Sequence, residues 1–435
     1  MSKPVVGFAG MTHLGINSAA AAAGKGFDTV CFDADPAVIA GLRTGSLPVM
    51  EGGLPELLAQ NRQHIAYSAE VKELKQCGVV YIAADVPTDG RGRSDLSGIR
   101  ALIDTVSAGL GRDAILVILC QVPPGFTRGL PWPKERLYYQ VETLIYGRAV
   151  ERAMHPERFI VGCAAPDRPL PQALHTFLSA FGCPILPMRY ESAELAKISI
   201  NCCLVASVTV TNTLAELSER IGADWAEIAP ALRLDKRIGQ YAYLSPGLGL
   251  AGGNLERDLE TVLQLAQETG SEAGLVRSFL VNSRHRRDWV LRILHDEVLA
   301  ASPKPVIGVL GLAYKENTHS TKNSASLDLI AELKPWRLQI HDPVVPASAA
   351  AHPDIKACAA PLEAAQGADA LAIMTPWPVY CELRINELAR AMAGRTVIDP
   401  YHVLDGAAAA AAGLDYFSLG ASSVRGNGSR RTAHA

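Results

Sequence analysis

Short apolar runs alternate with helical patterns over the first 190 residues of the chain. The runs are candidate strands because each is four to six residues long and is followed by a polar or glycine-containing segment. Helical patterns such as Gly15–Gly26 separate them, which is typical of βαβ units with a parallel, doubly wound sheet. The sequence therefore predicts an α/β domain over residues 1–190, with strands at Val5–Ala9, Thr29–Phe32, Val79–Ala83, Ala114–Leu119 and Phe159–Gly162.

Residues 191–300 carry no comparable strand pattern. Their apolar positions instead recur at helical spacing over Ala193–Ile221, Leu259–Thr269 and Val276–Leu299. The first of these helices is long enough to connect two domains or to line a subunit interface, and an ordinary buried helix is the alternative. We expect a helical middle domain that opens with this long central helix.

A second alternating block begins near residue 301. Its candidate strands are Val306–Gly311, Leu338–His341, Ala370–Ile373 and Thr396–Ile398. They predict a second α/β domain over residues 301–422, whereas residues 423–435 are rich in Ser, Arg, Gly and Asn and are expected to be a disordered tail. The predicted fold class is therefore α/β: two Rossmann-like, doubly wound parallel-sheet domains joined by a long central helix and a helical middle domain.

Composition excludes several classes of protein. Of the 435 residues, 49% are hydrophobic and 20% are charged, which indicates packed domains, and the net charge of −3 without a long basic run argues against a nucleic-acid partner. The nine cysteines are scattered, without disulfide or metal-ligand spacing, so we expect a reducing, cytoplasmic location and no metal. Neither a signal peptide nor an uncharged run of about 18 apolar residues is recognised, so no membrane association is expected.

The first candidate strand ends in Gly10-Met11-Thr12-His13-Leu14-Gly15. A dinucleotide-binding turn has glycine at the first, third and sixth of these places, and here Thr12 replaces the second glycine, where it would narrow the pyrophosphate cleft or donate its hydroxyl to it. Asp33 ends the second strand, 23 residues after Gly10, where a carboxylate suits the ribose hydroxyls of NAD and repels the extra phosphate of NADP. These features predict NAD binding, and a βαβ unit without a ligand is the alternative.

Several later motifs follow one another along the chain with regular order and spacing. They are Gly45-Ser46-Leu47-Pro48, Glu51-Gly52-Gly53-Leu54, the run from Gln121 to Thr127, the run from Ser192 to Lys197 with Asn201, the run from Pro246 to Asp258, the run from Gly311 to Thr318, and His341-Asp342-Pro343. Together they resemble the motifs of the UDP-glucose/GDP-mannose dehydrogenase family from Val5 to about Gly420. Members of that family oxidise the C6 alcohol of a nucleotide sugar twice with NAD, for polysaccharide biosynthesis.

The resemblance implies roles for individual side chains. Lys197 and Asn201 match residues that stabilise the developing oxyanion, Asp258 matches one that positions a water or accepts a proton, and Glu142 matches one that acts near thioester hydrolysis. A solvated lysine and surface carboxylates are the plainer alternatives for these positions, as is a surface ion pair for Asp258 with its neighbour Arg257. The cofactor residues implied are Gly10, Thr12, His13, Leu14, Gly15, Asp33, Val86 and Gln121, and the substrate residues are Tyr243, Gly249, Gly252, Gly253, Arg257 and Lys315.

The chain departs from the family pattern most sharply at Asn254. The gapless match of Pro246–Asp258 places this asparagine where the family has its nucleophilic cysteine. A thiolate is needed to trap the aldehyde before a second hydride leaves, and an amide cannot replace it. Further exchanges affect the same motifs: Gln121 for threonine, Val141 for proline, Tyr146 for glutamate, Arg257 for lysine, and His319, Ser320 and Lys322 within a "D-D-x-R" pattern.

Three hypotheses about function follow. The first is a single two-electron oxidation of a nucleotide sugar, with UDP as the family's commonest carrier. The second is an epimerase that retains NAD and returns the hydride, and the third is a catalytically silent protein that binds nucleotide sugars. A four-electron dehydrogenase that tolerates Asn254 is a minor fourth reading. The family resemblance also implies a homodimer that pairs through the long central helix.

Overall fold

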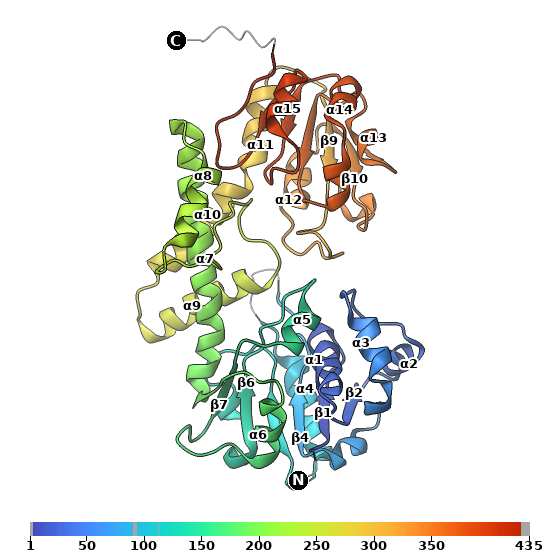
Figure 1. Ribbon diagram of the computed structural model, residues 1–435, viewed down its shortest axis with the longest axis vertical. Helices are drawn as coiled ribbons and strands as arrows, with labels where there is room; N and C mark the ends of the chain where they lie inside the picture. Colours follow the sequence, from blue (N-terminus) through green and yellow to red (C-terminus); the bar gives the residue numbers. More distant parts are fainter. Residues whose placement is uncertain (1–2, 90–93, 112, 428–435) are drawn as a thin grey trace. The chain divides into compact units, whose positions relative to one another are not determined.

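The computed structural model describes residues 3–89, 94–111 and 113–427. The chain forms two compact units, and the boundary between them falls between Ile200 and Asn201. This boundary lies inside helix α7 (Tyr190–Ile221), which joins the two units. The α/β class, with two parallel sheets, a long joining helix and a helical middle region, confirms the prediction (Figure 1).

The first unit is built on an eight-stranded sheet with the strand order β3-β2-β1-β4-β5-β6-β7-β8. Its strands are parallel except for the antiparallel pair β6 and β7. The strand order reverses between β1 and β4, and the carboxyl ends of strands at such a point are where ligands bind in open α/β sheets. The strands are β1 (Val6–Ala9), β2 (Thr29–Phe32), β3 (Ile65–Ser68), β4 (Val79–Ile82), β5 (Ile115–Ile118), β6 (Leu137–Gln140), β7 (Phe159–Cys163) and β8 (Ile185–Arg189).

Helices cover both faces of this sheet, because successive strand residues point to opposite sides. Phe8 on β1 belongs to one buried cluster and its neighbour Ala9 to another. Alanines on α1 are fully or almost fully buried, so their small side chains let this helix lie close to β1. The helices of the unit are α1 (His13–Gly24), α2 (Pro36–Thr44), α3 (Leu54–Gln60), α4 (Ser97–Gly109), α5 (Ala149–Met154) and α6 (Gln172–Ser179).

The second unit combines a helical region with a six-stranded parallel sheet of order β11-β10-β9-β12-β13-β14. The helical region continues from α7 into α8 (Trp225–Leu234), α9 (Asn254–Thr269), α10 (Gly274–Arg287) and α11 (Trp289–Leu294). The sheet comprises β9 (Val306–Leu310), β10 (Arg337–His341), β11 (Ile355–Ala357), β12 (Ala370–Ile373), β13 (Thr396–Ile398) and β14 (Asp415–Phe417), and its helices are α12 (Ala325–Glu332), α13 (Pro361–Ala365), α14 (Ile385–Ala391) and α15 (Gly406–Ala411).

Some elements differ from the prediction. The single helix expected over Val276–Leu299 is interrupted at Asp288 between α10 and α11, and it ends in one turn of π helix at His295–Leu299. Helix α8 was not predicted. Strands β3, β8, β11 and β14 were also missed, since β3, β8 and β11 lie at sheet edges and have few buried residues, which weakens the apolar signal.

Helix α7 corrects the expectation that no apolar stretch is long enough to cross a membrane. Residues 198–215 contain no charged side chain. By length and composition the helix passes that test, with a mean hydropathy of 1.5 over an 18-residue window, 33% of which is buried. Serine, threonine and asparagine interrupt its apolar residues, and α7 is a partly buried core helix of this fold.

The segment that follows β14 is ordered further than predicted. Val424 bridges to Tyr416, and the two terminal guanidinium nitrogens of Arg425 donate to the Glu297 carboxylate, each at 2.8 Å. The disordered tail predicted from residue 423 is therefore wrong for residues 423–427. Residues 428–435, the remainder of that prediction, lie outside the described part of the chain.

Candidate active site

The turn after β1 requires both of its glycines. Gly10 has φ +94°, and a Cβ there would lie 2.6 Å from the Cβ of Ala84. A Cβ on Gly15 would lie 1.8 Å from the carbonyl oxygen of Gly10, so α1 could not begin so close to the strand with any other residue. Thr12 precedes the helix, and its hydroxyl oxygen accepts a hydrogen bond from the backbone N–H of Asp85 at 2.9 Å.

Asp33 lies beside this turn at the end of β2. One carboxylate oxygen accepts from the backbone N–H of Met11 at 2.8 Å, and the other accepts from Asp35 at 3.0 Å. A carboxylate fixed in this way fits the ribose hydroxyls of NAD. The side chains of Leu14 and Val86, also predicted to bind the cofactor, are buried in the two cores, and Leu14 also lines a cavity.

His13 is the first residue of α1, and its ring is buried. Its Nε2 lies 3.0 Å from the carboxylate of Glu51, whose side chain has no exposed surface. The imidazole also stacks on the ring of Tyr146, with the centroids 3.9 Å apart and an angle of 18° between the planes. Glu51 accepts two more hydrogen bonds, from the backbone N–H groups of Gly147 at 3.0 Å and Ala149 at 2.9 Å.

Lys197 and Glu142 form a largely buried ion pair in the first unit. The Nζ of Lys197 lies 2.7 Å from Oε1 of Glu142, and their side chains are 10% and 16% exposed. The second oxygen of Glu142 accepts from the backbone N–H of Leu144 at 3.0 Å. The structure therefore rules out the plainer alternatives of a solvated lysine and a lone surface carboxylate.

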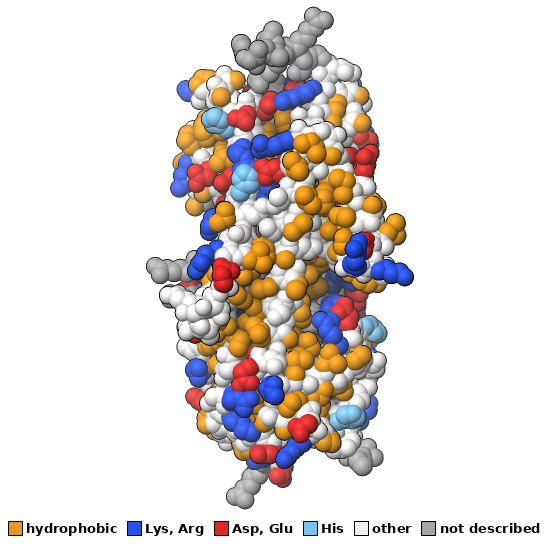
Figure 2. Space-filling model, turned by 90° about the vertical axis from the view of Figure 1, so that its left-hand side faces the viewer, with side chains coloured by type: hydrophobic (Ala, Val, Ile, Leu, Met, Phe, Trp, Pro, Cys, Tyr) orange, Lys and Arg blue, Asp and Glu red, His pale blue; other side chains and the backbone are white. Residues whose placement is uncertain are grey.

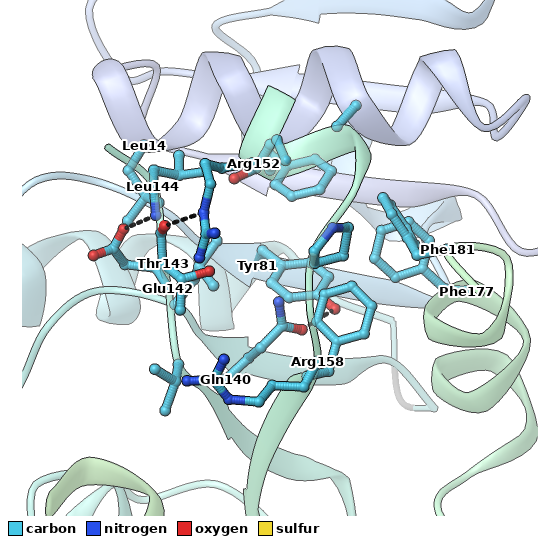
Figure 3. Close-up of a pocket in the computed structure, with 18 residues that line it drawn as sticks. Leu14, Tyr81, Gln140, Glu142, Thr143, Leu144, Arg152, Arg158, Phe177 and Phe181 are labelled. Carbon is cyan, nitrogen blue, oxygen red and sulfur yellow. Dashed lines mark hydrogen bonds between the residues drawn. The ribbon is translucent and has the colours of Figure 1, made fainter. Parts of the chain in front are cut away.

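A cavity of about 60 Å³ lies next to this pair. Residues 140–144 all line it, and the opposite wall is aromatic. Figure 3 shows Glu142, Thr143 and Leu144 together near Arg152, with Phe177 and Phe181 on the other side. Arg152 donates to the carbonyl of Thr143 at 3.3 Å.

The second unit brings Asn201 and Asp258 together. The amide nitrogen of Asn201, on α7, donates to a carboxylate oxygen of Asp258, on α9, at 2.5 Å. Asp258 is 1% exposed, and Nε of Arg257 lies 3.5 Å from its other oxygen. Arg257 is also buried, so the alternative of a surface ion pair is wrong. Asn254 is exposed at the start of α9, one turn before Asp258 and therefore on the same side of the helix.

The glycine-rich loop before α9 is held at several points. Gly249 has φ +80°, and a Cβ there would lie 2.4 Å from the carbonyl oxygen of Ser283 on α10. Gly252 donates its N–H to the carbonyl of Lys322 at 3.0 Å, while the Asn323 side chain donates to the carbonyl of Gly252 at 2.8 Å. Gly253, next in the loop, directly precedes the first turn of α9. The loop is thus fixed to the segment that follows β9.

Three other predicted substrate and cofactor residues have side chains with exposed surface. Tyr243 is 46% exposed, and its carbonyl accepts from the hydroxyls of Ser207 and Thr211. Lys315 is partly buried beyond β9, with its ammonium 5.7 Å from the centroid of the Tyr314 ring. Gln121, after β5, is partly exposed.

Sequence reasoning gave no role to two buried carboxylates, Glu51 and Glu194. Glu194 on α7 accepts from the backbone N–H groups of Gly125 at 2.6 Å and Thr127 at 2.9 Å, which fixes the loop after Gln121. Burial raises the pKa of Glu194 above its usual value, although these hydrogen bonds partly offset the effect. The only available signal was that both glutamates occur within family motifs.

Within the described residues, no group of three or more His, Cys, Asp or Glu side chains could hold a metal ion.

The carboxylate of Asp258 acts electrostatically on the thiol of Cys202, on α7. Burial raises its pKa to about 11, and the negative charge of Asp258 contributes. Cys202 is therefore a thiol at neutral pH rather than an activated nucleophile.

The parallel sheet, the glycine turn and Asp33 define an NAD-dependent dehydrogenase fold with a second Rossmann-like unit. Comparison with known families identifies the particular class. Residues 5–175 match the NAD binding domain of the UDP-glucose/GDP-mannose dehydrogenase family, residues 191–284 its central domain, and residues 308–406 its UDP binding domain. The chain belongs to this family, and it is an NAD-dependent nucleotide-sugar dehydrogenase that binds NAD and a UDP-sugar.

Individual relatives support the same assignment. The chain is 28% identical to the UDP-glucose 6-dehydrogenase TuaD of Bacillus subtilis, over 96% of this chain and 93% of that protein. It is 27% identical to a UDP-glucose 6-dehydrogenase of Pseudomonas aeruginosa, with 94% and 96% covered. Among solved structures, a UDP-glucose dehydrogenase from Pyrobaculum islandicum shares the fold with a TM-score of 0.83 at 24% identity, covering 92% of this chain and 95% of that one.

Proposed function

We propose that this enzyme oxidises a UDP-sugar once, by two electrons, and releases a carbonyl product. Asn254 carries the proposal, because this first residue of α9 stands where the family resemblance places the nucleophilic cysteine. Without a thiolate the aldehyde cannot be held as a thiohemiacetal for a second oxidation. The thiol of Cys202, with its raised pKa, does not supply the missing nucleophile.

NAD, when bound, accepts the hydride from the carbinol carbon of the sugar. The proton of the substrate hydroxyl leaves to Asp258, directly or through a water, and the carbon–oxygen bond becomes a carbonyl. The short hydrogen bond from Asn201 holds the Asp258 carboxylate in one orientation. The second amide hydrogen of Asn201 then remains available to the reacting oxygen.

Lys197 supplies positive charge for the oxyanion that develops as the proton leaves. Its ion pair with Glu142 limits the rotamers of the lysine side chain. Lys197 and Asn201 lie four residues apart on α7 and therefore on one side of the helix. We assign Glu142 to the orientation of Lys197, because a chain without the nucleophilic cysteine forms no thioester to hydrolyse.

We further assign the ligand-binding residues as follows. NAD is held by the turn from Gly10 to Gly15, including Thr12 and the backbones of His13 and Leu14, by Asp33, and by the region of Val86 and Gln121. The UDP-sugar is held by Tyr243, Gly249, Gly252, Gly253, Arg257 and Lys315. Buried Arg257, fixed beside Asp258, is suited to an anionic ligand because a guanidinium binds phosphate oxygens with paired hydrogen bonds.

We also propose that the enzyme is a cytoplasmic homodimer. Val210, Leu214, Leu217 and Ile221 follow one another at helical spacing on α7, and they are between 42% and 65% exposed. An apolar stripe of this kind is typical of an interface with a second protein surface. Figure 2 views the side of the molecule that carries α7 and α8, and hydrophobic side chains gather along it. A second copy of the chain can cover the stripe because a twofold axis pairs a surface with itself.

The decisive experiment incubates the purified enzyme with NAD and a panel of UDP-sugars, follows NADH absorbance and weighs each product. One NADH per sugar and a product two mass units lighter would support the proposal. Two NADH per sugar with a uronic acid product would overturn it in favour of the four-electron reaction. An isomerised sugar of unchanged mass without NADH would identify an NAD-retaining epimerase, and an unaltered sugar that still binds would identify a silent binding protein.

A further inference from the structure

Three side chains from separate segments of the first unit meet next to the cofactor turn. His13 begins α1, Glu51 precedes α3, and Tyr146 belongs to the connection between β6 and α5. They are joined by the His13–Glu51 hydrogen bond and the stacking of His13 on Tyr146, and we call them the His13 cluster. Tyr146 stands where the family resemblance gives a glutamate.

Glu51 is the centre of the cluster. Its carboxylate is fully buried and accepts three N–H groups, from His13 and from the backbones of Gly147 and Ala149. Hydrogen bonds to a buried carboxylate are stronger than neutral ones, and leaving one unmade is costly. The cofactor turn and the start of α5 are therefore held to the same group, although they are more than 130 residues apart in the sequence.

The segment between β6 and α5 has no regular secondary structure, yet it carries Glu142. One end is fixed by the Glu142–Lys197 pair and the other by the His13 cluster. Between these ends the segment lines the cavity that Figure 3 shows, so it is not pressed against a filled core. Because packing leaves space on one side, the position of the segment depends on its polar contacts, which include those at its two ends and the hydrogen bond from Arg152 to the carbonyl of Thr143.

We propose that the His13 cluster couples occupancy of the cofactor turn to the position of Glu142, and through it to Lys197. The inference rests on the proposed function, because Glu142 matters only if Lys197 takes part in the reaction. An anion binds the N-terminal N–H groups of α1 in this fold, where His13 stands. Fixing that turn fixes the His13 ring, and Glu51 and Tyr146 pass the restraint to the segment that carries Glu142. His13 and Tyr146 are positioning residues in this arrangement.

Hydrogen exchange followed by mass spectrometry tests the coupling without turnover. Wild type, His13→Phe and the matched control His64→Phe, which removes a partly exposed histidine of the same unit, are compared with and without saturating NAD. We expect NAD to slow exchange at residues 10–24 in all three proteins. It should slow exchange at residues 142–149 about tenfold in wild type and the control, within the usual range for coupled sites, but not in His13→Phe.

The proposal would be overturned if NAD slowed hydrogen exchange at residues 142–149 equally in His13→Phe and in wild type. It would also be overturned if NAD did not slow exchange at these residues in wild type. If NAD also failed to slow exchange at residues 10–24 in His13→Phe, the side chain of His13 would be a direct cofactor ligand, which would overturn the proposal as well. If His13→Phe does not fold, Tyr146→Ala replaces it, because Tyr146 is 38% exposed and its removal leaves Glu51 paired. Because hydrogen exchange requires no turnover, it tests the coupling even if the enzyme does not carry out the proposed reaction.

Kinetics in the active enzyme separate coupling from general damage. If the cluster acts through Glu142, then His13→Phe introduced into the wild-type enzyme should lower kcat about tenfold. The same substitution introduced into Glu142→Gln should lower kcat no further. The KM for NAD should change less than kcat. Additive losses in the double variant would mean that His13 acts independently of Glu142, which contradicts the coupling.

Discussion

Asp33 and Asp342 accept corresponding backbone hydrogen bonds in the two sheets. Asp33, after β2, accepts from Met11, the residue after Gly10, and Asp342, after β10, accepts from Leu312, the residue after Gly311. The two glycines have φ values of +94° and +99°. The same turn is thus built twice, and each carboxylate fixes the first backbone N–H beyond the strand.

Replacing Asp33 by Ala should weaken NAD binding. It removes the acceptor of the Met11 N–H and the carboxylate that we assign to the ribose hydroxyls, a loss of about 2 kcal/mol, or roughly 30-fold in KM for NAD. Discrimination against NADP should fall in the same variant, because the negative charge is gone. The check is KM for both cofactors in Asp33→Ala and in Asp28→Ala, which removes an exposed aspartate of the same unit. Unchanged preference for NAD would contradict the assignment of Asp33.

Asn254→Cys should convert the enzyme to a double oxidation. The new thiol would stand in the first turn of α9, where the helix N-terminus lowers a thiol pKa, and four residues before Asp258. The measurement is NADH formed per sugar, which we expect to rise from one to two. Asn254→Ser is the control, since a hydroxyl of similar size lacks the nucleophilicity of a thiolate. A wild-type stoichiometry in the cysteine variant would show that other residues limit the second step.

Lys197→Ala should lower kcat by about 10²- to 10³-fold, the usual effect of losing one preorganised oxyanion donor. The variant also leaves Glu142 buried without its cation, which costs stability. Lys197→Met with Glu142→Gln removes both charges and separates the two effects: its melting temperature should recover, whereas its kcat should not. Recovery of kcat in the double variant would show that Lys197 has only a structural role.

The stability contributed by Glu194 should decline as pH rises. Burial raises the pKa of this carboxyl in the folded state, so the folded state binds the proton more tightly than the unfolded state. The stabilising contribution is then complete below the unfolded value and is lost as pH rises through the folded pKa. The free energy of unfolding of wild type relative to Glu194→Gln should therefore be most favourable in acid. Urea titrations of both proteins across the acidic range to pH 7 measure this difference, and an advantage that grows with pH would contradict the raised pKa.

Leu214→Asp combined with Leu217→Asp should produce a monomer, because charges on the α7 stripe cannot be buried against a second copy. Light scattering should give twice the 46.3 kDa of one chain for wild type and the single-chain mass for the variant. Leu186→Asp, an exposed leucine of β8, is the matched control and should leave the mass unchanged. A monomeric wild type would remove the dimer proposal.

The sequence by itself determined the features that depend on neighbours along the chain. The turn from Gly10 to Gly15 and Asp33 could be predicted because one βαβ unit fixes their spacing, and the resulting NAD-binding fold is confirmed. The asparagine at position 254, on which the single-oxidation proposal rests, is likewise visible without coordinates. The central strands were found because both of their faces are buried, which gives uninterrupted apolar runs.

Only the tertiary structure decided which distant groups meet. Glu51 accepts from Gly147 and Ala149, nearly a hundred positions away, and no local pattern signals that contact. The half-exposed edge strands and the break at Asp288 were missed for the same reason: packing and partners, rather than a periodic apolar signal, fix them. A buried carboxylate binds whichever N–H groups the fold brings to it, so its partners are settled when the elements pack.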